Sequence, residues 1–507
     1  MFLKKHWLIM VIIPLFAFVV LFMVSKNSPL YLDNDWVDVN IFFTIGRGWA
    51  HGMLPYRDLF DQKGPILYAI YALAGGISGQ YWSIFILEWL CFTGSLFLVY
   101  LIGKRFLTQQ LSLGFVFLGG LLLVLSPFFV TGGSAEEWML PSILYLIDRT
   151  LAIDANERQT WRDGFLIGLA VAWVFWIKYT AFGAWLGFWI VLVICKMLTK
   201  QWRELWQLFT GAVIGGLALS LPILAYFGFR HGLKALGFSY FVANLKYYPA
   251  GVEVGFIGRL LNSLSAYFTR FSSMPILLIL STVGLLAIII DRKIFRSIPG
   301  LLLFLGAYFC LIVLTLSGRS NYPYYWLICM PFVLMSLLPI LIRIGTKQTA
   351  ESTLIVALAS LVLIVTFNTN IKDSRIYPYN AAIDVSLRSK VPAQIAFAHR
   401  IKQSKNRSFL NYNALDMGVY QALGELPSNR FFFKANLPTD KFPAMMNQQN
   451  LIIEQKQVKF VATSVYAYQD EKTAVPALLK NNYRRIMRRV RYSSGAKLTM
   501  LLYERKD

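Results

Sequence analysis

The chain has 507 residues, of which 57% are hydrophobic and only 15% are charged. A soluble protein of this size carries about 25% charged residues and about 45–50% apolar ones. With a mean hydropathy of +0.54, this composition excludes a soluble globular enzyme, a disordered chain and a fibrous repeat, and it predicts a polytopic α-helical membrane protein.

The net charge of +23 comes from 49 Lys and Arg residues against 26 Asp and Glu residues. In a membrane protein, cationic loops hold the cytoplasmic ends of helices and face anionic lipid, so we expect membrane lipid as a partner and no nucleic acid. The four cysteines lie in apolar runs without CxxC spacing, which predicts neither a disulfide framework nor a structural zinc site.

Apolar segments long enough to cross a bilayer occur about eleven times. The first follows Lys4-Lys5-His6, and we expect it to be a retained span rather than a cleaved signal peptide. The run 164–195 is too long for one span, and we expect two short helices that meet at Lys178-Tyr179-Thr180. The predicted spans are 7–24, 81–102, 111–131, 138–153, 164–177, 180–198, 205–228, 274–290, 298–317, 324–342 and 352–369.

Basic loops predict the sidedness of these spans. If the spans alternate, the cations of six loops fall on one side, which should be cytoplasmic. The apolar segment 65–78 could count as another span, but Lys104-Arg105 would then lie outside, so we interpret it as a half-buried interfacial segment. The basic loops contain Lys4-Lys5, Lys104-Arg105, Arg149 to Arg162, Lys196 to Arg203, Arg292 to Arg296 and Arg343 to Lys347. The outer side then collects 25–80, 132–137, 178–180, 229–273, 318–323 and the tail.

The tail, 370–507, is polar and predicts a small extracytoplasmic α/β domain, which leaves 1–369 as the membrane module. We expect strands at 407–412, 458–464 and 497–503, and helices at 417–423 and 474–482. Its charge is about +13, from 23 basic and 10 acidic residues. This charge fits a solubilising domain near anionic lipid or a docking surface for an anionic acceptor polymer, and both interpretations stay open.

The first outer loop contains the most informative pattern. Apolar residues at helical spacing predict an amphipathic helix over 38–52 that lies in the membrane surface, with Asp38 at its start. Asp38 is either the N-cap of this helix or a general base at the membrane–water boundary. Further on, Arg57 and Lys63 are cations at a depth that suits a lipid phosphate, although snorkelling explains Arg57 equally well.

The order of these residues resembles the GT-C membrane glycosyltransferases, in the protein O-mannosyltransferase-like branch and the lipid A aminoarabinose transferases. The match runs from Asp33 to Tyr68 and includes the sequence Tyr-Arg-Asp-Leu-Phe-Asp-Gln-Lys-Gly-Pro that begins at Tyr56. The resemblance implies a GT-C fold and a sugar donor linked to polyprenyl phosphate, such as undecaprenyl phosphate. It also implies that Asp38 is the catalytic acid of the first loop and that Lys63 contacts the carrier phosphate. Asp61 matches an acidic residue beside Lys63 and is a further catalytic candidate, as is Glu136.

Further positions follow from the same resemblance. The stretch Gly132 to Trp138 resembles the second acidic motif, for which Glu136 is favoured and Glu137 remains an alternative. Lys178 matches a Lys after the fifth span. Near Arg319, Tyr324 stands where many relatives have His, and no pair of histidines has ligand spacing. A divalent metal on Asp38, Asp61 and Glu136 is a further hypothesis. Candidates for the donor phosphate are Lys63, Lys178, Arg230 and Arg319; candidates for substrate contacts are Arg57, Glu137, Tyr247 and Tyr324.

The resemblance implies an inverting, single-displacement hexosyl or pentosyl transfer with Asp38 as the base. The expected acceptor is an extracytoplasmic cell-wall glycopolymer, teichoic acid or glycolipid, and the expected location is the bacterial plasma membrane. The alternative is a transporter or flippase of polyprenyl lipid or polysaccharide. Such a transporter would show paired broken helices or internal repeats, and the sequence shows no repeat.

Overall fold

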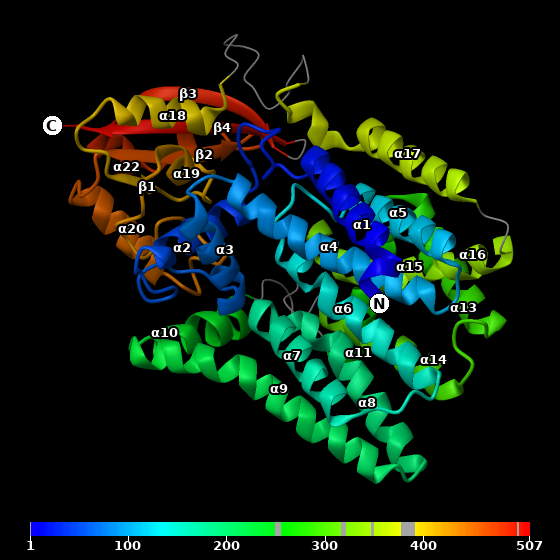
Figure 1. Cartoon of the computed structure of the whole chain (residues 1–507). Coiled ribbons are helices and arrows are strands. Elements are labelled where there is room, and N and C mark those ends of the chain that lie inside the picture. Colours follow the sequence, from blue (N-terminus) through cyan, green and yellow to red (C-terminus); the bar gives the residue numbers. More distant parts are fainter. Residues whose placement is uncertain are drawn as a thin grey trace. The chain divides into compact units, whose positions relative to one another are not determined.

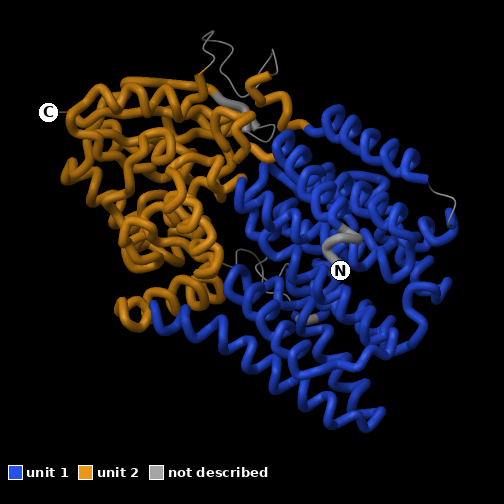
Figure 2. Tube along the Cα trace, in the orientation of Figure 1, with its two compact units in different colours: residues 1–24, 86–226, 251–368 blue, residues 25–85, 227–250, 369–507 orange. Residues whose placement is uncertain are grey.

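The computed structural model describes residues 2–248, 255–315, 321–345, 349–376, 391–493 and 496–506. These residues divide into two compact units, drawn in blue and orange in Figure 2. Unit 1 comprises Met1–Val24, Ile86–Tyr226 and Gly251–Asn368, whereas unit 2 comprises Ser25–Phe85, Phe227–Ala250 and Thr369–Asp507.

Unit 1 is helical (Figure 1). Each predicted span overlaps a helix or a succession of helical segments, and seven helices of the described residues are long and apolar enough to cross a membrane. Its main helices are α1 (Phe2–Val24), α4 (Trp82–Lys104), α5 (Gln109–Leu125), α6 (Ala135–Asp154), α7 (Trp161–Ile177), α8 (Gly183–Leu198), α9 (Trp202–Phe229), α11 (Phe256–Phe271), α14 (Ile298–Thr315) and α17 (Ala350–Phe367). Shorter segments are η1 (Tyr179–Phe182), α12 (Pro275–Ile279), η3 (Leu280–Gly284), α13 (Leu285–Asp291), η4 (Pro323–Cys329), α15 (Met330–Leu334), η5 (Met335–Leu337) and α16 (Leu338–Ile344).

The predicted break at Lys178 is confirmed. Helix α7 ends at Ile177, and Lys178 has an extended backbone before the short segment η1 leads into α8. Lys178 therefore lies where two helices meet, and its charge does not have to cross the middle of a continuous span.

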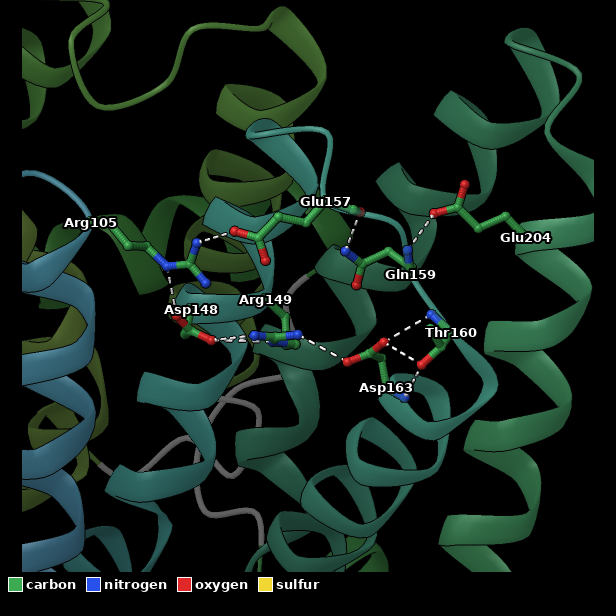
Figure 3. Close-up of polar contacts among 8 residues, drawn as sticks. All are labelled: Arg105, Asp148, Arg149, Glu157, Gln159, Thr160, Asp163 and Glu204. Atoms are coloured by element: carbon green, nitrogen blue, oxygen red, sulfur yellow. Dashed lines mark hydrogen bonds and ion pairs between the residues drawn. The ribbon is translucent and has the colours of Figure 1, made fainter. Parts of the chain in front are cut away.

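Polar contacts link the loops that charge assigned to a single side. Figure 3 shows Arg105, which follows α4, paired with Asp148 on α6 and with Glu157 in the next loop. Asp148 also pairs with Arg149, and Arg149 pairs with Asp163 on α7. Farther along this end, Glu204 on α9 accepts from the Gln159 backbone and pairs with Lys196 on α8. These loops therefore lie at the same end of unit 1, as predicted.

The cluster in Figure 3 predicts a stability difference between two acidic residues. Asp148 is 6% exposed and binds two partly buried arginines, so Asp148→Ala removes two charge-assisted hydrogen-bonding partners and should cost about 1–3 kcal/mol. Glu157 has a 47% exposed side chain, so Glu157→Ala should cost at most about 1 kcal/mol. Thermal unfolding of the two variants in one detergent checks the order, and an equal loss would contradict it.

Unit 2 combines the first outer loop with the tail. Its first helices are α2 (Val37–Ala50) and α3 (Pro65–Ile77), followed by α10 (Leu233–Leu236) and the π-helical segment η2 (Gly237–Tyr247). The tail contributes η7 (Thr369–Asp373), α18 (Ala393–Lys402), α19 (Val419–Leu423), α20 (Ala444–Glu454), α21 (Glu471–Ala474) and α22 (Ala477–Asn482). Its strands are β1 (Phe409–Asn411), β2 (Phe460–Tyr466), β3 (Tyr483–Ser493) and β4 (Ala496–Arg505).

The strands form a four-stranded sheet in the order β1-β2-β4-β3. Strand β1 is parallel to β2, and the other two pairings are antiparallel. Val461, Val465, Leu479, Leu501 and Tyr503 are buried in the hydrophobic core of this domain. Three predicted strands correspond to β1, β2 and β4, but β3, α18 and α20 were not predicted.

Helix α2 is more enclosed than the sequence predicted. We expected an amphipathic helix in the membrane surface, but ten consecutive residues from Val39 to Gly48 are buried. One face packs on α3, where Gly46 meets the backbone of Tyr71 so closely that a Cβ would overlap it. The other side contacts α19 of the tail domain (Figure 1). The helix is therefore an internal element of unit 2.

Candidate active site

Asp38 lies in the first turn of α2, as its second residue. The N-cap is Trp36, which makes no side-chain capping bond, so the interpretation of Asp38 as the N-cap is wrong. The side chain is half-buried. The first turn of α2 places this carboxylate at the helix N-terminus, where the helix dipole has its partial positive charge.

Asp61 is buried near Asp38 and Lys63. The hydroxyl of Tyr68 on α3 donates to its Oδ2 at 2.6 Å. Burial raises the pKa of Asp61, the charge of Lys63 opposes this shift, and the charge of Asp38 adds to it. The structure therefore brings together three residues that the sequence predicted: Asp38, Asp61 and Lys63.

The backbone of Lys63 is fixed by two buried tyrosines. The hydroxyl of Tyr56 donates to the Lys63 carbonyl at 2.8 Å, and the Lys63 amide donates to the Tyr68 hydroxyl at 3.0 Å. Next to it, Asn244 of η2 donates to the Gln62 carbonyl at 2.7 Å. Tyr56 and Tyr68 were not assigned roles from the sequence, because nothing in a lone tyrosine indicates which backbone group it contacts.

Arg57 and Arg230 lie together at an exposed edge of this loop. Arg57 donates to the Arg230 carbonyl at 3.0 Å, and Arg230 donates to the Gly52 carbonyl at 2.8 Å. The guanidinium of Arg57 also binds Asp58, and this bond is the main reason why the pKa of Asp58 is lowered. Both arginines are exposed.

Tyr247 belongs to an aromatic group rather than to the polar cluster. Its ring lies 6.2 Å from that of Phe238 and 5.5 Å from that of Phe442 in the tail domain. These contacts join η2 to the segment before α20. A role in lining the sugar site stays a prediction.

Unit 1 contains the other predicted carboxylate. Glu136, in the first turn of α6, is completely buried and binds the ammonium of Lys178 at 2.6 Å. The same ammonium lies 3.1 Å from the centre of the Tyr325 ring, in cation–π geometry. The sequence predicted Glu136 and Lys178 separately; their pairing, and the part of Tyr325, required the structure.

Glu137 has a different environment. It forms a capping box with Ser134, in which its carboxylate accepts from the Ser134 amide at 2.9 Å. Its side chain also hydrogen-bonds the buried Glu88 on α4. Glu136 therefore pairs with a cation, whereas Glu137 caps its own helix, and which of the two acts in the site stays a prediction.

The motif around Arg319 is only partly visible, because Arg319 lies outside the described residues. Tyr324, which stands where relatives have His, is buried, and its ring contacts those of Tyr322 and Tyr325. The neighbouring Tyr325 faces Lys178, so the ring that contacts the polar pair is one residue beyond the predicted position.

A metal site receives no support from the described residues. They contain no group of three or more His, Cys, Asp or Glu side chains that could hold an ion. The hypothetical ligand set combines Asp38 and Asp61 of unit 2 with Glu136 of unit 1, and it stays a prediction.

The tail domain holds α2 through a buried polar network. The carboxylate of Asp416 accepts from the Thr44 hydroxyl at 2.8 Å and from the Gly418 amide at 3.0 Å. Arg47 donates to Gln421 at 2.9 Å and to the Gly424 carbonyl at 2.8 Å. The helix that presents Asp38 is therefore anchored by residues about 370 positions later in the chain.

This network predicts a pH dependence of stability. Burial raises the pKa of Asp416 from 3.8 to about 6. Folding therefore favours the protonated carboxyl, and the stability that this contributes is present below about pH 4 and is lost as the pH rises through about 6. The loss is about 3 kcal/mol for a shift of about two units.

Melting temperatures of the wild type and of Asp416→Asn between pH 4 and pH 8 check this prediction. The wild type should lose stability relative to Asp416→Asn as the pH rises from 4 to about 7, and the difference should then stay constant. A difference that does not change with pH would contradict it.

Comparisons with known proteins concern the sequence and the fold of the whole chain. No protein-family model matches the chain, and no curated protein matches its sequence. Solved structures do match it in fold, and two of ArnT are among them. ArnT from Cupriavidus metallidurans bound to undecaprenyl phosphate is 13% identical, with a TM-score of 0.58 over 99% of this chain and 98% of that one. ArnT from the same organism in the apo state is 12% identical, with a TM-score of 0.60 over 98% of each chain.

The predicted fold class is confirmed by these comparisons and by the helices themselves. The chain is a polytopic helical membrane protein with a small C-terminal sheet domain. The resemblance noted for the first outer loop is confirmed at the level of the fold, since the chain shares the fold of ArnT over nearly its whole length.

Proposed function

We propose that the protein is a membrane glycosyltransferase that moves a sugar from a polyprenyl-phosphate carrier to an acceptor outside the cytoplasm. The observation that carries this proposal is the cluster of Asp38, Asp61 and Lys63, two carboxylates and a cation held by buried tyrosines. This cluster offers a base and a phosphate contact within one unit. The shared fold supports it, since one ArnT structure contains undecaprenyl phosphate.

In the proposed reaction Asp38 takes the proton of the acceptor hydroxyl as the oxygen attacks C1 of the sugar. A bond forms between this oxygen and C1, and the bond from C1 to the carrier phosphate breaks. The electron pair leaves with the polyprenyl phosphate, so the configuration at C1 inverts. Polyprenyl phosphate is stable as an anion, and no acid has to protonate it.

Cations stabilise the leaving phosphate in this scheme. Lys63 is the first candidate, because its charge acts directly on the buried Asp61 beside the base. Arg57 and Arg230 supply exposed guanidinium groups at the edge of the same loop. Lys178 and Arg319 stay candidates from unit 1, although Lys178 is already neutralised by Glu136.

The acceptor and the location complete the proposal. We expect the donor to be an undecaprenyl-phosphate hexose or pentose, and the acceptor to be a cell-wall glycopolymer, teichoic acid or glycolipid. The membrane is then the bacterial plasma membrane, with unit 2 on its outer side. The clustering of basic loops at one end of unit 1 supports this orientation, because cationic loops stay in the cytoplasm.

The test is a transfer assay with purified protein, a panel of radiolabelled undecaprenyl-phosphate sugars and a bacterial membrane extract. The proposal expects one donor to be consumed and its label to appear in the extract. A transporter would instead move labelled lipid across a vesicle bilayer without breaking the sugar–phosphate bond. If the donor stayed intact in every reaction and labelled lipid crossed the vesicle bilayer, the protein would be a transporter and the proposal would be wrong.

A further inference from the structure

The outer edge of the tail sheet carries a concentration of positive charge. Strand β3 is the edge strand of the order β1-β2-β4-β3, and arginines recur along it. We define the basic edge as the cations that gather around two carboxylates on this side of the domain: Arg400, Lys459, Arg484, Arg485 and Arg488.

The carboxylates do not balance these cations. Glu504 on β4 lies 3.4 Å from Arg484, 3.5 Å from Arg400 of α18 and 3.6 Å from Lys459. Glu471 of α21 lies 3.1 Å from Arg488 and also pairs with Arg485. Five cations thus share two carboxylates, which leaves three positive charges without a counter-ion inside this cluster.

The arginines of β3 remain accessible. Their side chains are 67% exposed for Arg484, 48% for Arg485 and 49% for Arg488. Exposed ion pairs are worth at most about 1 kcal/mol, so an external anion can compete for these guanidinium groups. The register places Arg484 opposite Glu504, and Arg485 and Arg488 opposite Tyr503 and Leu501, so cations project from both faces of the edge strand.

The spacing of these cations fits a repeating anion. Arg484 and Arg488 are separated by a β-bulge between Arg485 and Met487 and project from opposite faces of the strand. At about 3.3 Å per residue they lie at most about 13 Å apart along it, and one phosphate or carboxylate does not bind both. Guanidinium groups bind carboxylate, phosphate and sulfate in a bidentate manner. An extended polyanion satisfies several of them together, whereas single anions would have to bind one by one.

Exposed aromatic rings in the same sheet favour a polysaccharide over other polyanions. Tyr466 and Tyr468, at the end of β2, stack with ring centres 5.6 Å apart and an angle of 13°. Tyr468 is 83% exposed. Flat rings with a polar tip suit the alternating apolar faces and hydroxyl edges of sugar rings, and exposed aromatic groups of this kind mark binding surfaces.

The basic edge is connected to the helix of the proposed base. Helix α18, which carries Arg400, packs on β3 and on α19, and α19 packs on α2. We propose that the basic edge binds an anionic polysaccharide and that this polysaccharide is the acceptor polymer delivered to Asp38. This inference rests on the proposed function, and it narrows the acceptor from any extracytoplasmic glycan to a polyanionic one.

The test measures binding without turnover. The full chain in nanodiscs of phosphatidylcholine is titrated with fluorescent dextran sulfate and, separately, with neutral dextran. We expect the wild type to bind only the sulfated polymer, with an affinity that falls as salt is added. Arg484→Gln/Arg488→Gln should weaken binding roughly tenfold. Glu504 keeps Arg400 and Lys459, and Glu471 keeps Arg485, so neither carboxylate loses all its partners.

Matched controls separate this surface from bulk charge. Arg292→Gln/Lys293→Gln, at the end of α13 in unit 1, removes the same charge and should leave binding unchanged. Asp38→Asn should bind dextran sulfate as the wild type does while failing to transfer sugar, so loss of the proposed function and loss of this surface are distinguishable. Equal weakening by both double variants would overturn the inference. So would capture of phosphatidylglycerol vesicles that depends on Arg484 and Arg488 while dextran sulfate binding does not.

Discussion

Asp38→Asn is expected to lower sugar transfer by about 10²–10⁴-fold, the range that a general base contributes. The amide of Asn cannot accept the hydroxyl proton, and Asn has nearly the same size and shape as Asp. Asp38 is half-buried and is not the N-cap of α2, so folding should be preserved. The measurement is the initial rate of transfer, together with the melting temperature of the same preparation.

A second Asp→Asn substitution in unit 2 tests whether the loss of any carboxylate lowers the transfer rate. Asp440 is exposed between Thr439 and Lys441, and Asp440→Asn should leave the transfer rate within twofold of wild type, since exposed substitutions have small effects. A well-folded Asp38→Asn protein with normal turnover would remove Asp38 from the mechanism. Equal losses in the two variants would point to an effect of net charge.

Lys178→Met is expected to destabilise unit 1 by about 3–5 kcal/mol, because it leaves the charge of Glu136 buried without its partner. Glu136 is completely buried, and the Lys178 ammonium at 2.6 Å is the cation that binds it. The loss of the cation over the Tyr325 ring adds to this cost. The measurement is the thermal unfolding of the purified variant in detergent.

The double variant Lys178→Met/Glu136→Gln separates pairing from position. It removes both charges, so it should recover much of the stability that Lys178→Met loses. If the single and double variants were equally unstable, the ion pair would not explain the effect. Transfer activity of the stable double variant then reports whether either charge is needed for the reaction.

The helices of unit 1 were predictable because their signal is local. Runs of about 20 apolar residues, bounded by cations, define spans without any knowledge of their neighbours. The break at Lys178 was visible for the same reason, since a charge within a long apolar run is costly unless the helix ends there. Contacts between the ends of α4, α6, α7, α8 and α9 agree with the loop charges.

The elements of unit 2 were harder to predict because its contacts connect distant parts of the sequence. Strand β3 was missed because its repeated arginines hide the alternation of apolar and polar residues that indicates a strand. Helix α2 was expected to have one solvent-exposed face, but the tail domain covers that face, with Asp416 bound to Thr44 and Gln421 bound to Arg47. No local pattern in residues 37–50 indicates a partner beyond residue 400.

The same distinction explains the candidate site. Asp38 and Lys63 were named because charged residues near the ends of apolar segments are conspicuous, whereas Asp61, Glu136 and Lys178 were named as site residues through the family resemblance. Their supporting partners were not, because Tyr56, Tyr68 and Tyr325 lie in a chain with 26 tyrosines, most of which pack or anchor. The different partners of Glu136 and Glu137, an ion pair and a capping box, are seen only in the folded chain.

The most direct test of the account is the fate of a defined donor. Purified protein is incubated with undecaprenyl-phosphate sugar carrying one label on the sugar and another on the lipid, with the acceptor fraction that supports transfer. The account predicts equal amounts of free undecaprenyl phosphate and glycosylated acceptor, with inverted configuration at C1, and neither product with Asp38→Asn. Retained configuration, or transfer by Asp38→Asn at the wild-type rate, would contradict a single displacement with Asp38 as its base.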